Sequence, residues 1–295
     1  MTKTWLLIDS NNICWQSFYA MGRLSWKESP ISQESPTEAL YGLLRRLLSL
    51  QARYTTRRVA FCFDVGESVR KARCETYKAN RKKLAESLSD EDKEERQGLY
   101  DQINLLREEY LPYIGYRNVF GIERYEADDI IAHLCLSTSY QIVKPDKAVI
   151  VSNDKDLLQC LRDNVSIDKN DTNYTKTNFM AKWRFHPKKW AEVKAISGCS
   201  TDNIPGVPGV GELTAAKYIR GILPKHHKTY KAIQECEEII RLNRQVVELP
   251  YKYFRPTDLL HTLKLRSDKL NKKRWRKLMR KLGMRSLVQS YPRGM

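Results

Sequence analysis

The chain has 295 residues, which is enough for one large domain or two modest ones, each with its own hydrophobic core. An apolar fraction of 41% and a charged fraction of 29% are typical of soluble globular proteins, and no apolar run is long enough to span a bilayer. The net charge of +17 predicts attraction to polyanions, to nucleic acid first and to anionic membranes second. The seven cysteines form no Cys-x-x-Cys pair, which argues against a structural zinc site.

Three apolar runs in the first half of the chain each stop at a carboxylate. They are Trp5–Ile8 before Asp9, Val59–Phe63 before Asp64, and Ala148–Val151 before Asp154. Continuous apolar runs separated by helical patterns indicate buried strands of a parallel sheet, so we expect an α/β fold. The first run is too short for the core of a signal peptide, so we expect a cytoplasmic protein.

Helical periodicity fills the segments between these strands. Leu40–Leu50 predicts the helix that joins the first two strands, and Glu126–Leu136 predicts another. After residue 183 the pattern is purely helical and turn-like, which places a soft domain boundary near residue 180. The predicted organisation is therefore a core of residues 1–180 and a helical part of residues 181–295.

Residues 69–101 are dominated by charge and have few apolar anchors. Composition alone favours a solvated helical excursion or a partly disordered loop without function.

Acidic residues cluster where the predicted strands end. Asp154 and Asp156 follow the third strand, and Glu126, Asp128 and Asp129 begin a helix. Each acid alone is explained by helix capping, but this many together would repel one another unless cations neutralised them. Oxygen ligands at this density favour Mg²⁺ or Mn²⁺ over zinc, and two such ions can activate water for phosphodiester hydrolysis.

A turn rich in glycine and proline spans residues 202–212, between helical patterns at Trp190–Ile196 and Leu213–Ile219. Three glycines in it let the backbone approach a ligand, and the following helix presents its N-terminal amides. These features are typical of a helix–hairpin–helix that grips a duplex phosphate without reading sequence. The predicted contacts are Gly206, Val207, Gly209, Gly211 and Lys217.

Six stretches together resemble the 5′ nuclease family, which comprises phage 5′ nucleases, the 5′ nuclease domain of bacterial DNA polymerase I and flap endonucleases. They are Leu7-Ile-Asp-Ser-Asn11, Phe63-Asp64, Val69-Arg70 with Tyr77-Lys-Ala-Asn-Arg81, Tyr125-Glu-Ala-Asp-Asp129, Val151-Ser-Asn-Asp-Lys-Asp-Leu157, and Asp202-Asn-Ile-Pro-Gly-Val-Pro-Gly-Val-Gly211. The resemblance implies a PIN-like nuclease core, a helical arch at about residues 69–110, and a helix-three-turn-helix for the duplex. It therefore replaces the interpretation of the charged excursion as a functionless loop.

The resemblance also implies roles for individual residues. Asp9, Asp64, Glu126, Asp128 and Asp129 resemble the ligands of a first divalent cation, and Asp154, Asp156 and Asp202 those of a second. Arg70, Lys78 and Arg81 resemble the cations that contact the scissile phosphate, while Tyr77 either stacks on a base or packs. A monovalent cation at the hairpin is implied as well.

The chain departs from the family pattern at one position. The usual Gly-Asp-x-x-Asp-Asn-Ile run is Gly198-Cys199-Ser-Thr-Asp202-Asn-Ile here, so a cysteine replaces an acid of the second metal site. A basic segment near the end carries Trp275, Leu278 and Met279 at helical spacing, which predicts a packed helix with a cationic outer face. Whether that face contacts DNA stays open.

We expect a monomeric 5′–3′ exonuclease and flap endonuclease that acts on DNA with a 5′ single-stranded arm. Two alternatives remain at this point. One is a branched-DNA binding protein with weak or lost catalysis, which only Cys199 favours. The other is a metal-dependent ribonuclease, which the hairpin and arch disfavour, although removal of RNA primers from RNA–DNA hybrids stays open.

Overall fold

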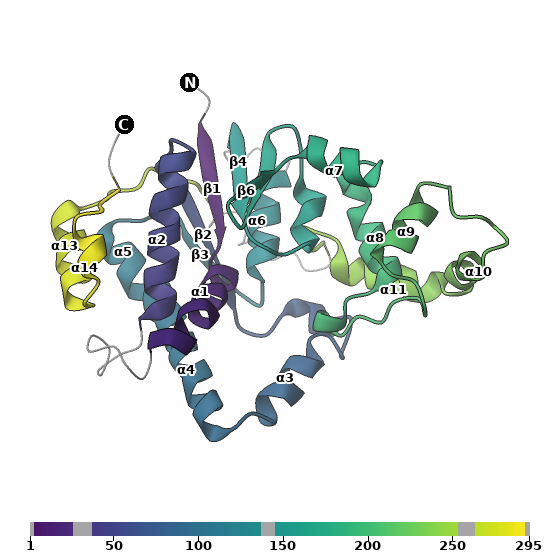
Figure 1. Ribbon diagram of the computed structural model, residues 1–295, viewed down its shortest axis with the longest axis horizontal. Coiled ribbons are helices and arrows are strands. Elements are labelled where there is room, and N and C mark those ends of the chain that lie inside the picture. The colour runs from purple at the N-terminus through teal and green to yellow at the C-terminus, as the bar shows by residue number, and fades with distance from the viewer. Residues whose placement is uncertain (1–2, 26–36, 137–144, 253–262, 293–295) are drawn as a thin grey trace.

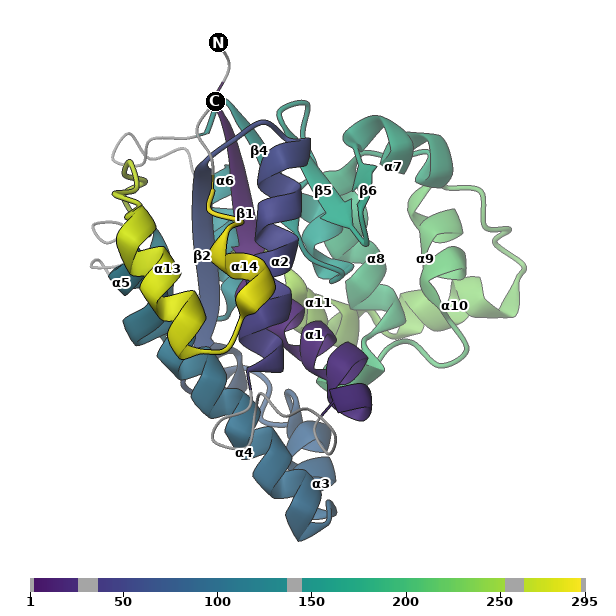
Figure 2. The ribbon, with the colours of Figure 1, turned by 60° about the vertical axis from the view of Figure 1, so that its left-hand side comes forward.

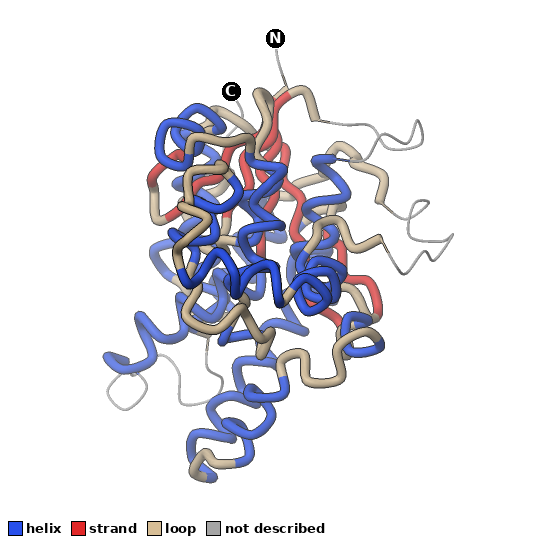
Figure 3. Tube along the Cα trace, turned by 90° about the vertical axis from the view of Figure 1, so that its right-hand side faces the viewer, coloured by secondary structure: helices blue, strands red, loops and turns tan. Residues whose placement is uncertain are grey.

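The computed structural model describes residues 3–25, 37–136, 145–252 and 263–292, and these form helices around one six-stranded sheet (Figures 1 and 3). The strands are β1 (Thr4–Asp9), β2 (Arg58–Val65), β3 (Val119–Glu123), β4 (Lys147–Val151), β5 (Val165–Lys169) and β6 (Thr172–Tyr174). Their order is β3-β2-β1-β4-β5-β6, and every pair is parallel except β5 with β6. The predicted α/β fold with a parallel sheet is confirmed, with the three predicted strands at its centre.

The central strand β1 is buried on both faces, which explains its unbroken apolar run. Leu6 and Ile8 point into one core cluster, while Trp5 and Leu7 point into another on the opposite face. The first cluster packs under α1 (Ser10–Ser25) and α2 (Glu38–Arg53), the predicted helix between the first two strands. From β1 the chain proceeds outward through β2 to β3 on one side of the sheet, and from β4 through β5 to β6 on the other. The carboxyl end of β1 therefore lies at the point where the strand order reverses, which is where open parallel sheets bind ligands.

The other face of the sheet is covered by the middle of the chain. Residues from α6 (Ala127–Leu136), α7 (Lys176–Trp183), α8 (Trp190–Ser197) and α9 (Glu212–Ile219) share one apolar cluster with β1 and β4. Further out lie α10 (Lys228–Glu235) and α11 (Glu237–Val247), at the right of Figure 1. The helical part is thus continuous with the core of the sheet.

The last described elements, α13 (Lys272–Lys281) and α14 (Arg285–Val288), return to the first face of the sheet beside α2 and α5 (Leu111–Ile114), as Figure 2 shows. The buried Trp275 donates from Nε1 to Leu287 O at 2.8 Å, and both residues belong to the cluster under α2. Its helical pattern had placed this segment in the predicted helical part of residues 181–295. Its apolar residues instead complete the core of the sheet.

The charged excursion forms two helices, α3 (Ala79–Glu86) and α4 (Asp90–Leu105), which project below the sheet and meet at their far ends (Figure 1). Ser89 caps α4 by accepting from Asp92 N at 3.1 Å, and acids fill the first turn where the helix dipole favours them. Leu99 and Ile103 anchor the other end of α4 in the core. This geometry is that of the expected helical arch. No helix among the described residues is long and apolar enough to cross a membrane.

Candidate active site

Asp9 lies at the carboxyl end of β1 with only 8% of its surface exposed. Its carboxylate accepts hydrogen bonds from Asn12 N at 3.2 Å and from the Ser152 hydroxyl at 2.7 Å. Asp9 therefore caps α1, the role expected for a single acid before a helix, and it also faces the end of β4. Burial, together with the charges of Asp64 and Asp154, raises the pKa of Asp9 to about 7.

Asp64 lies at the end of the neighbouring strand and connects β2 to the start of α6. Its Oδ1 accepts from Ala127 N at 2.7 Å, while its own backbone N–H donates to Asn11 Oδ1 at 3.1 Å. The Asp64 side chain reaches the surface, but the surrounding chain desolvates its carboxyl, and this effect together with the nearby Glu126 raises its pKa. The strand end is thus fixed beside the acidic helix start.

One carboxylate oxygen from each of Glu126, Asp128 and Asp129 lies within 4.8 Å of the other two. Asp128 Oδ1 is buried and has no hydrogen-bond partner among the described residues. Although Arg70 opposes the shift, burial and the two neighbouring acids raise the pKa of Asp128 well above its usual value. We call Asp9, Asp64, Glu126, Asp128 and Asp129 the first carboxylate group.

Arg70 does not lie where a phosphate could reach it. The side chain is 2% exposed, its Nε donates to Val246 O at 2.9 Å, and two nitrogens contact the Asp129 carboxylate at 2.6 and 2.7 Å. The predicted contact between Arg70 and the scissile phosphate therefore does not fit this structure. Asp129, predicted as a metal ligand, uses both of its oxygens to hold this buried guanidinium.

Glu126 connects the first carboxylate group to the base of the arch. Its Oε2 accepts from Arg70 Nη1 and from the Tyr77 hydroxyl, both at 2.8 Å, and its Oε1 contacts Lys78 Nζ. Burial opposes ionisation of Glu126, but the charges of Arg70 and Lys78 prevail and hold its pKa below the usual value. Tyr77 is 4% exposed and packs here, so of the two predicted roles it does not fit base stacking.

Arg81, one turn along α3, reaches the start of the hairpin. Its Nη2 lies 2.7 Å from Asp202 Oδ1, and the side chain remains half exposed. The backbone of Lys78 donates to Asp202 O at 2.8 Å, and Asn203 donates to Thr76 O at 2.9 Å. These bonds tie the base of the arch to the hairpin, so that Lys78 contacts Glu126 while Arg81 contacts Asp202.

The second carboxylate group consists of Asp154, Asp156 and Asp202. Asp156 N donates to Asp154 Oδ1 at 2.8 Å, and burial and Asp154 raise the pKa of Asp156 to about 6. The ammonium of Lys194, from α8, lies 3.0 Å from Asp156 Oδ1 and is almost fully buried. Lys194 is not among the site residues predicted from the sequence, because a lysine within an apolar helical pattern gives no sign of an acidic partner 38 positions earlier.

Cys199 lies at the edge of this second group. Its thiol donates to Asp202 Oδ2 at 3.3 Å, and its backbone pairs with Ile204 through two bonds of 2.9 Å. Burial and the nearby Asp202 raise the pKa of Cys199 above its usual value. The side chain is therefore a neutral thiol at pH 7, which donates a hydrogen bond where the family pattern has a carboxylate.

The hairpin glycines divide into two kinds. A Cβ on Gly206 would lie 2.1 Å from Ser197 O, so Gly206 is required for packing against the end of α8. Gly209 has φ +74° and, like Gly211, has open space where a Cβ would lie. Gly211 also precedes the first turn of α9. Gly209 and Gly211 therefore leave the backbone accessible, as predicted, whereas Gly206 does not.

Two other predicted hairpin contacts lie differently from the expectation. Val207 is 3% exposed and donates from its backbone to Ile196 O at 2.8 Å, so it anchors the turn and does not meet solvent. Lys217 is exposed but belongs to the last turn of α9, away from the helix start at Glu212. Its ammonium can therefore meet a phosphate beside the last turn of α9, but not at the amino end of the helix.

The acidic groups fit divalent cations in their chemistry. Their donors are carboxylate oxygens, the ligands that Mg²⁺ and Mn²⁺ prefer. Asp128 Oδ1 is buried without a hydrogen bond and has only a 3.7 Å ion pair with Arg70, while burial and the neighbouring Asp64 raise the pKa of Asp9. A bound cation would offset both the burial of these carboxylates and their mutual repulsion. The second group fits less well, because Lys194 and Arg81 already neutralise two of its three carboxylates.

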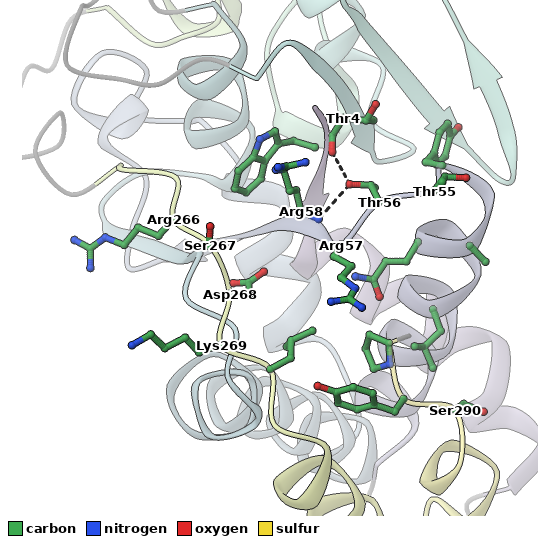
Figure 4. Close-up of a pocket in the computed structure, with 18 residues that line it drawn as sticks. Thr4, Thr55, Thr56, Arg57, Arg58, Arg266, Ser267, Asp268, Lys269 and Ser290 are labelled. Carbon is green, nitrogen blue, oxygen red and sulfur yellow. Dashed lines mark hydrogen bonds between the residues drawn. The ribbon is translucent and has the colours of Figure 1, made fainter. Parts of the chain in front are cut away.

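A pocket of about 1060 Å³ lies at the opposite end of the sheet (Figure 4). It is lined by the amino ends of β1 and β2, including Thr4 and Arg58, and by the segment Arg266–Leu270. None of the predicted site residues lines it, and in open parallel sheets ligands bind at the carboxyl ends of strands. The carboxylate groups therefore define the candidate active site.

Comparisons with known proteins agree with this assignment. The chain is 30% identical over 298 residues to a 5′-3′ exonuclease of Aquifex aeolicus, covering 97% of this chain and 94% of the relative. It is also 30% identical over 255 residues to DNA polymerase I of Caldicellulosiruptor bescii, covering 82% of this chain but 27% of that polymerase.

A solved structure of bacteriophage T5 5′-exonuclease with bound zinc ions shares the fold. It has a TM-score of 0.70 at 21% identity and covers 88% of this chain and 92% of its own. The family model of the 5′-3′ exonuclease N-terminal resolvase-like domain matches residues 4–184. With the match over nearly its whole length to the Aquifex exonuclease, this shows that the chain belongs to the 5′-3′ exonuclease family.

Proposed function

We propose that this exonuclease hydrolyses DNA phosphodiesters near 5′ ends and at 5′ flaps, with Mg²⁺ or Mn²⁺ as the cation. Its substrate would be DNA with a 5′ single-stranded arm, bound by a monomer, with RNA–DNA hybrids as a second substrate. One observation carries the proposal. At the arch base Lys78 pairs with Glu126 and Arg81 pairs with Asp202. Both charges also act on Asp64 at the end of β2, so a phosphate between the arch and this strand end would meet cations and carboxylates together.

The acidic residues of the site would bind the cations or position the residues that bind them. Divalent cations bound by the carboxylates would supply an activated water and stabilise the leaving oxygen. Asp9, Asp64, Glu126 and Asp128 would hold the first of them, and Asp154, Asp156 and Asp202 the second. Asp129 would act indirectly, because it holds the Arg70 side chain in place and Arg70 in turn orients the Glu126 carboxylate.

Lys78 and Arg81 would meet the negative charge that grows on the phosphoryl oxygens. Both now rest on carboxylates, Glu126 and Asp202, so an arriving phosphate would compete with those acids for the two cations. Burial opposes the charge on Lys78, but Glu126 raises the Lys78 pKa above its usual value, so the ammonium is protonated throughout the neutral range. The backbone at Gly209 and Gly211 would grip the duplex, with a monovalent cation at that turn.

The test is cleavage of a 5′-labelled flap with and without Mg²⁺, by wild type, Asp64→Ala and the control Asp163→Ala. Asp163 is a highly exposed acid far from β2, so its loss leaves the site intact. We expect Asp64→Ala to abolish cleavage while binding to the flap stays within a few-fold, because affinity comes mainly from cations. Hydrolysis by Asp64→Ala near the wild-type rate would refute the assigned pocket. A wild type that binds but never cuts would favour the DNA-binding alternative, and labelled RNA–DNA hybrids test primer removal.

A further inference from the structure

The helix α13 divides sharply into an apolar and a cationic side. Trp275, Leu278 and Met279 are buried in the core under α2. The remaining side chains of the helix are seven cations, and six of them are exposed. They are Lys272, Lys273, Arg274, Arg276, Lys277, Arg280 and Lys281. We call these seven residues the α13 cationic face.

The charges of the α13 cationic face are not neutralised within the described part of the chain. No carboxylate there forms an ion pair with any of the seven, and the hydrogen bonds they make run to neutral groups, from Arg274 to Tyr113 O and from Arg276 to Gln289. Lys273, Lys277 and Lys281 follow one another at spacings of four, where like charges repel. Cations in the first turn also oppose the helix dipole. This arrangement costs stability in the free protein, and a polyanion laid along the helix would relieve it.

The α13 cationic face lies far from the hairpin. Figures 1 and 2 both place α13 on one side of the sheet and α9 and α10 on the other, with the arch between and below them. The hairpin can hold one duplex arm. A flap, however, has two duplex arms that diverge at the branch, and the second arm leaves the site in another direction.

We propose that the α13 cationic face binds the phosphate backbone of this second duplex arm. The proposal rests on the proposed function, since it takes a branched DNA as the substrate. Lysines and arginines on one helix face suit a regular row of phosphates, and such contacts add affinity without reading sequence. The protein would thus hold a branched substrate at two places, one on each side of the catalytic groups.

The test replaces four exposed cations together, as Lys273→Gln, Lys277→Gln, Arg280→Gln and Lys281→Gln. A matched control removes the same charge from exposed lysines elsewhere, as Lys169→Gln, Lys182→Gln, Lys188→Gln and Lys189→Gln. Dissociation constants are measured without divalent cations, so that nothing is cut, for a flap with two duplex arms and for the same 5′ arm on a single duplex. A salt series is recorded for each.

We expect the α13 variant to lose on the order of tenfold affinity for the two-armed flap and to lower the slope of log K against log salt by about one per lost phosphate contact. Its affinity for the single-duplex substrate, and its rate of cutting that substrate, should match wild type. The control variant should weaken both substrates equally. Equal losses of the α13 variant on both substrates, or no loss on either, would overturn the proposal. Because binding is measured with catalysis off, a wild type that fails to cut would count against the proposed function alone.

Discussion

Lys194 and Asp156 form a buried ion pair, with the ammonium 3.0 Å from Asp156 Oδ1 inside the second carboxylate group. Although burial opposes it, Asp156 raises the pKa of Lys194 above its usual value, so this positive charge is permanent at neutral pH. The pair reduces the negative charge that this group offers to a divalent cation. The first carboxylate group, with five acids against Arg70 and Lys78, should therefore bind a cation more tightly than the second.

Replacing Lys194 by methionine should strengthen the second site. The change removes a positive charge beside Asp156 and keeps the volume of the side chain, so Mn²⁺ affinity there should rise on the order of tenfold. Without metal the unpaired Asp156 should lower the melting temperature, and Mn²⁺ should restore it. Calorimetric titration of the DNA-free protein measures the affinity, with exposed Lys182→Met as the control. Unchanged Mn²⁺ binding would show that Lys194 has no influence on the site.

Cys199→Asp should act in the same direction by adding a ligand. The wild-type thiol is neutral and makes a weak ligand for Mg²⁺, so we expect an active enzyme that needs more Mg²⁺ than a site with the full acidic set and responds well to Mn²⁺. The aspartate variant should cut at lower Mg²⁺ concentration, while Asp202→Ala should need more. Cleavage rates across a metal titration compare the three proteins. Identical Mg²⁺ curves for wild type and Cys199→Asp would exclude Cys199 from the metal site.

Lys78→Ala should slow the chemical step much more than it weakens binding. A cation that meets charge developing on the phosphate stabilises mainly the transition state, and the loss should be of order 10²-fold or more. Single-turnover rates at saturating enzyme measure it, with Lys71→Ala, a partly exposed lysine paired to Glu67, as the control. A change in affinity alone would make Lys78 a binding residue.

Gly209→Val should weaken binding to flaps with a long duplex arm and spare plain single strands. A branched side chain would occupy the open space through which a phosphate approaches the backbone. Gly221→Val is a matched control, because Gly221 has φ +71° and equally open surroundings at the far end of α9. Both variants therefore carry similar backbone strain. Equal losses in the two variants would indicate that the hairpin turn is structural only.

Asp9→Asn should stabilise the metal-free protein in a pH-dependent way. Burial, Asp64 and Asp154 raise the pKa of Asp9 from 3.8 to about 7, so ionised Asp9 costs stability as pH rises above 4, and the full cost is reached above pH 7. The gain at pH 8 should be no more than about 4 kcal/mol, and at pH 4 it should vanish. Urea unfolding in EDTA at both pH values measures it, with Asp163→Asn as the control. A variant no more stable than wild type at pH 8 would contradict the raised pKa of Asp9.

The apolar runs of the sequence predicted the three central strands of the sheet, β2, β1 and β4, but not the outer strands. β1, β2 and β4 are buried on both faces and therefore form unbroken apolar runs. In contrast, β3 is interrupted by Gly121 and ends in Glu123, and β5 carries Ser166 and Asp168 between its apolar residues. The acids at the strand ends were found because each one follows such a run. The exposure of the other predicted site residues depends on tertiary contacts, which the sequence pattern does not show. Arg70 and Val207 belong to stretches shared with the family, yet the packing of α6, α8 and α11 around them buries both.

The return of α13 to the sheet has a consequence for how the protein folds during synthesis. Trp275, Met279 and Leu287 fill the same apolar cluster as Leu6, Ile8 and the leucines of α2, so the first face of the sheet stays incomplete until residue 288 has left the ribosome. Before that, the strands and acids at the start of the chain lack part of their support. A protein cut after the hairpin would therefore lack part of this core, and we expect its nuclease part to be less stable than in the full chain.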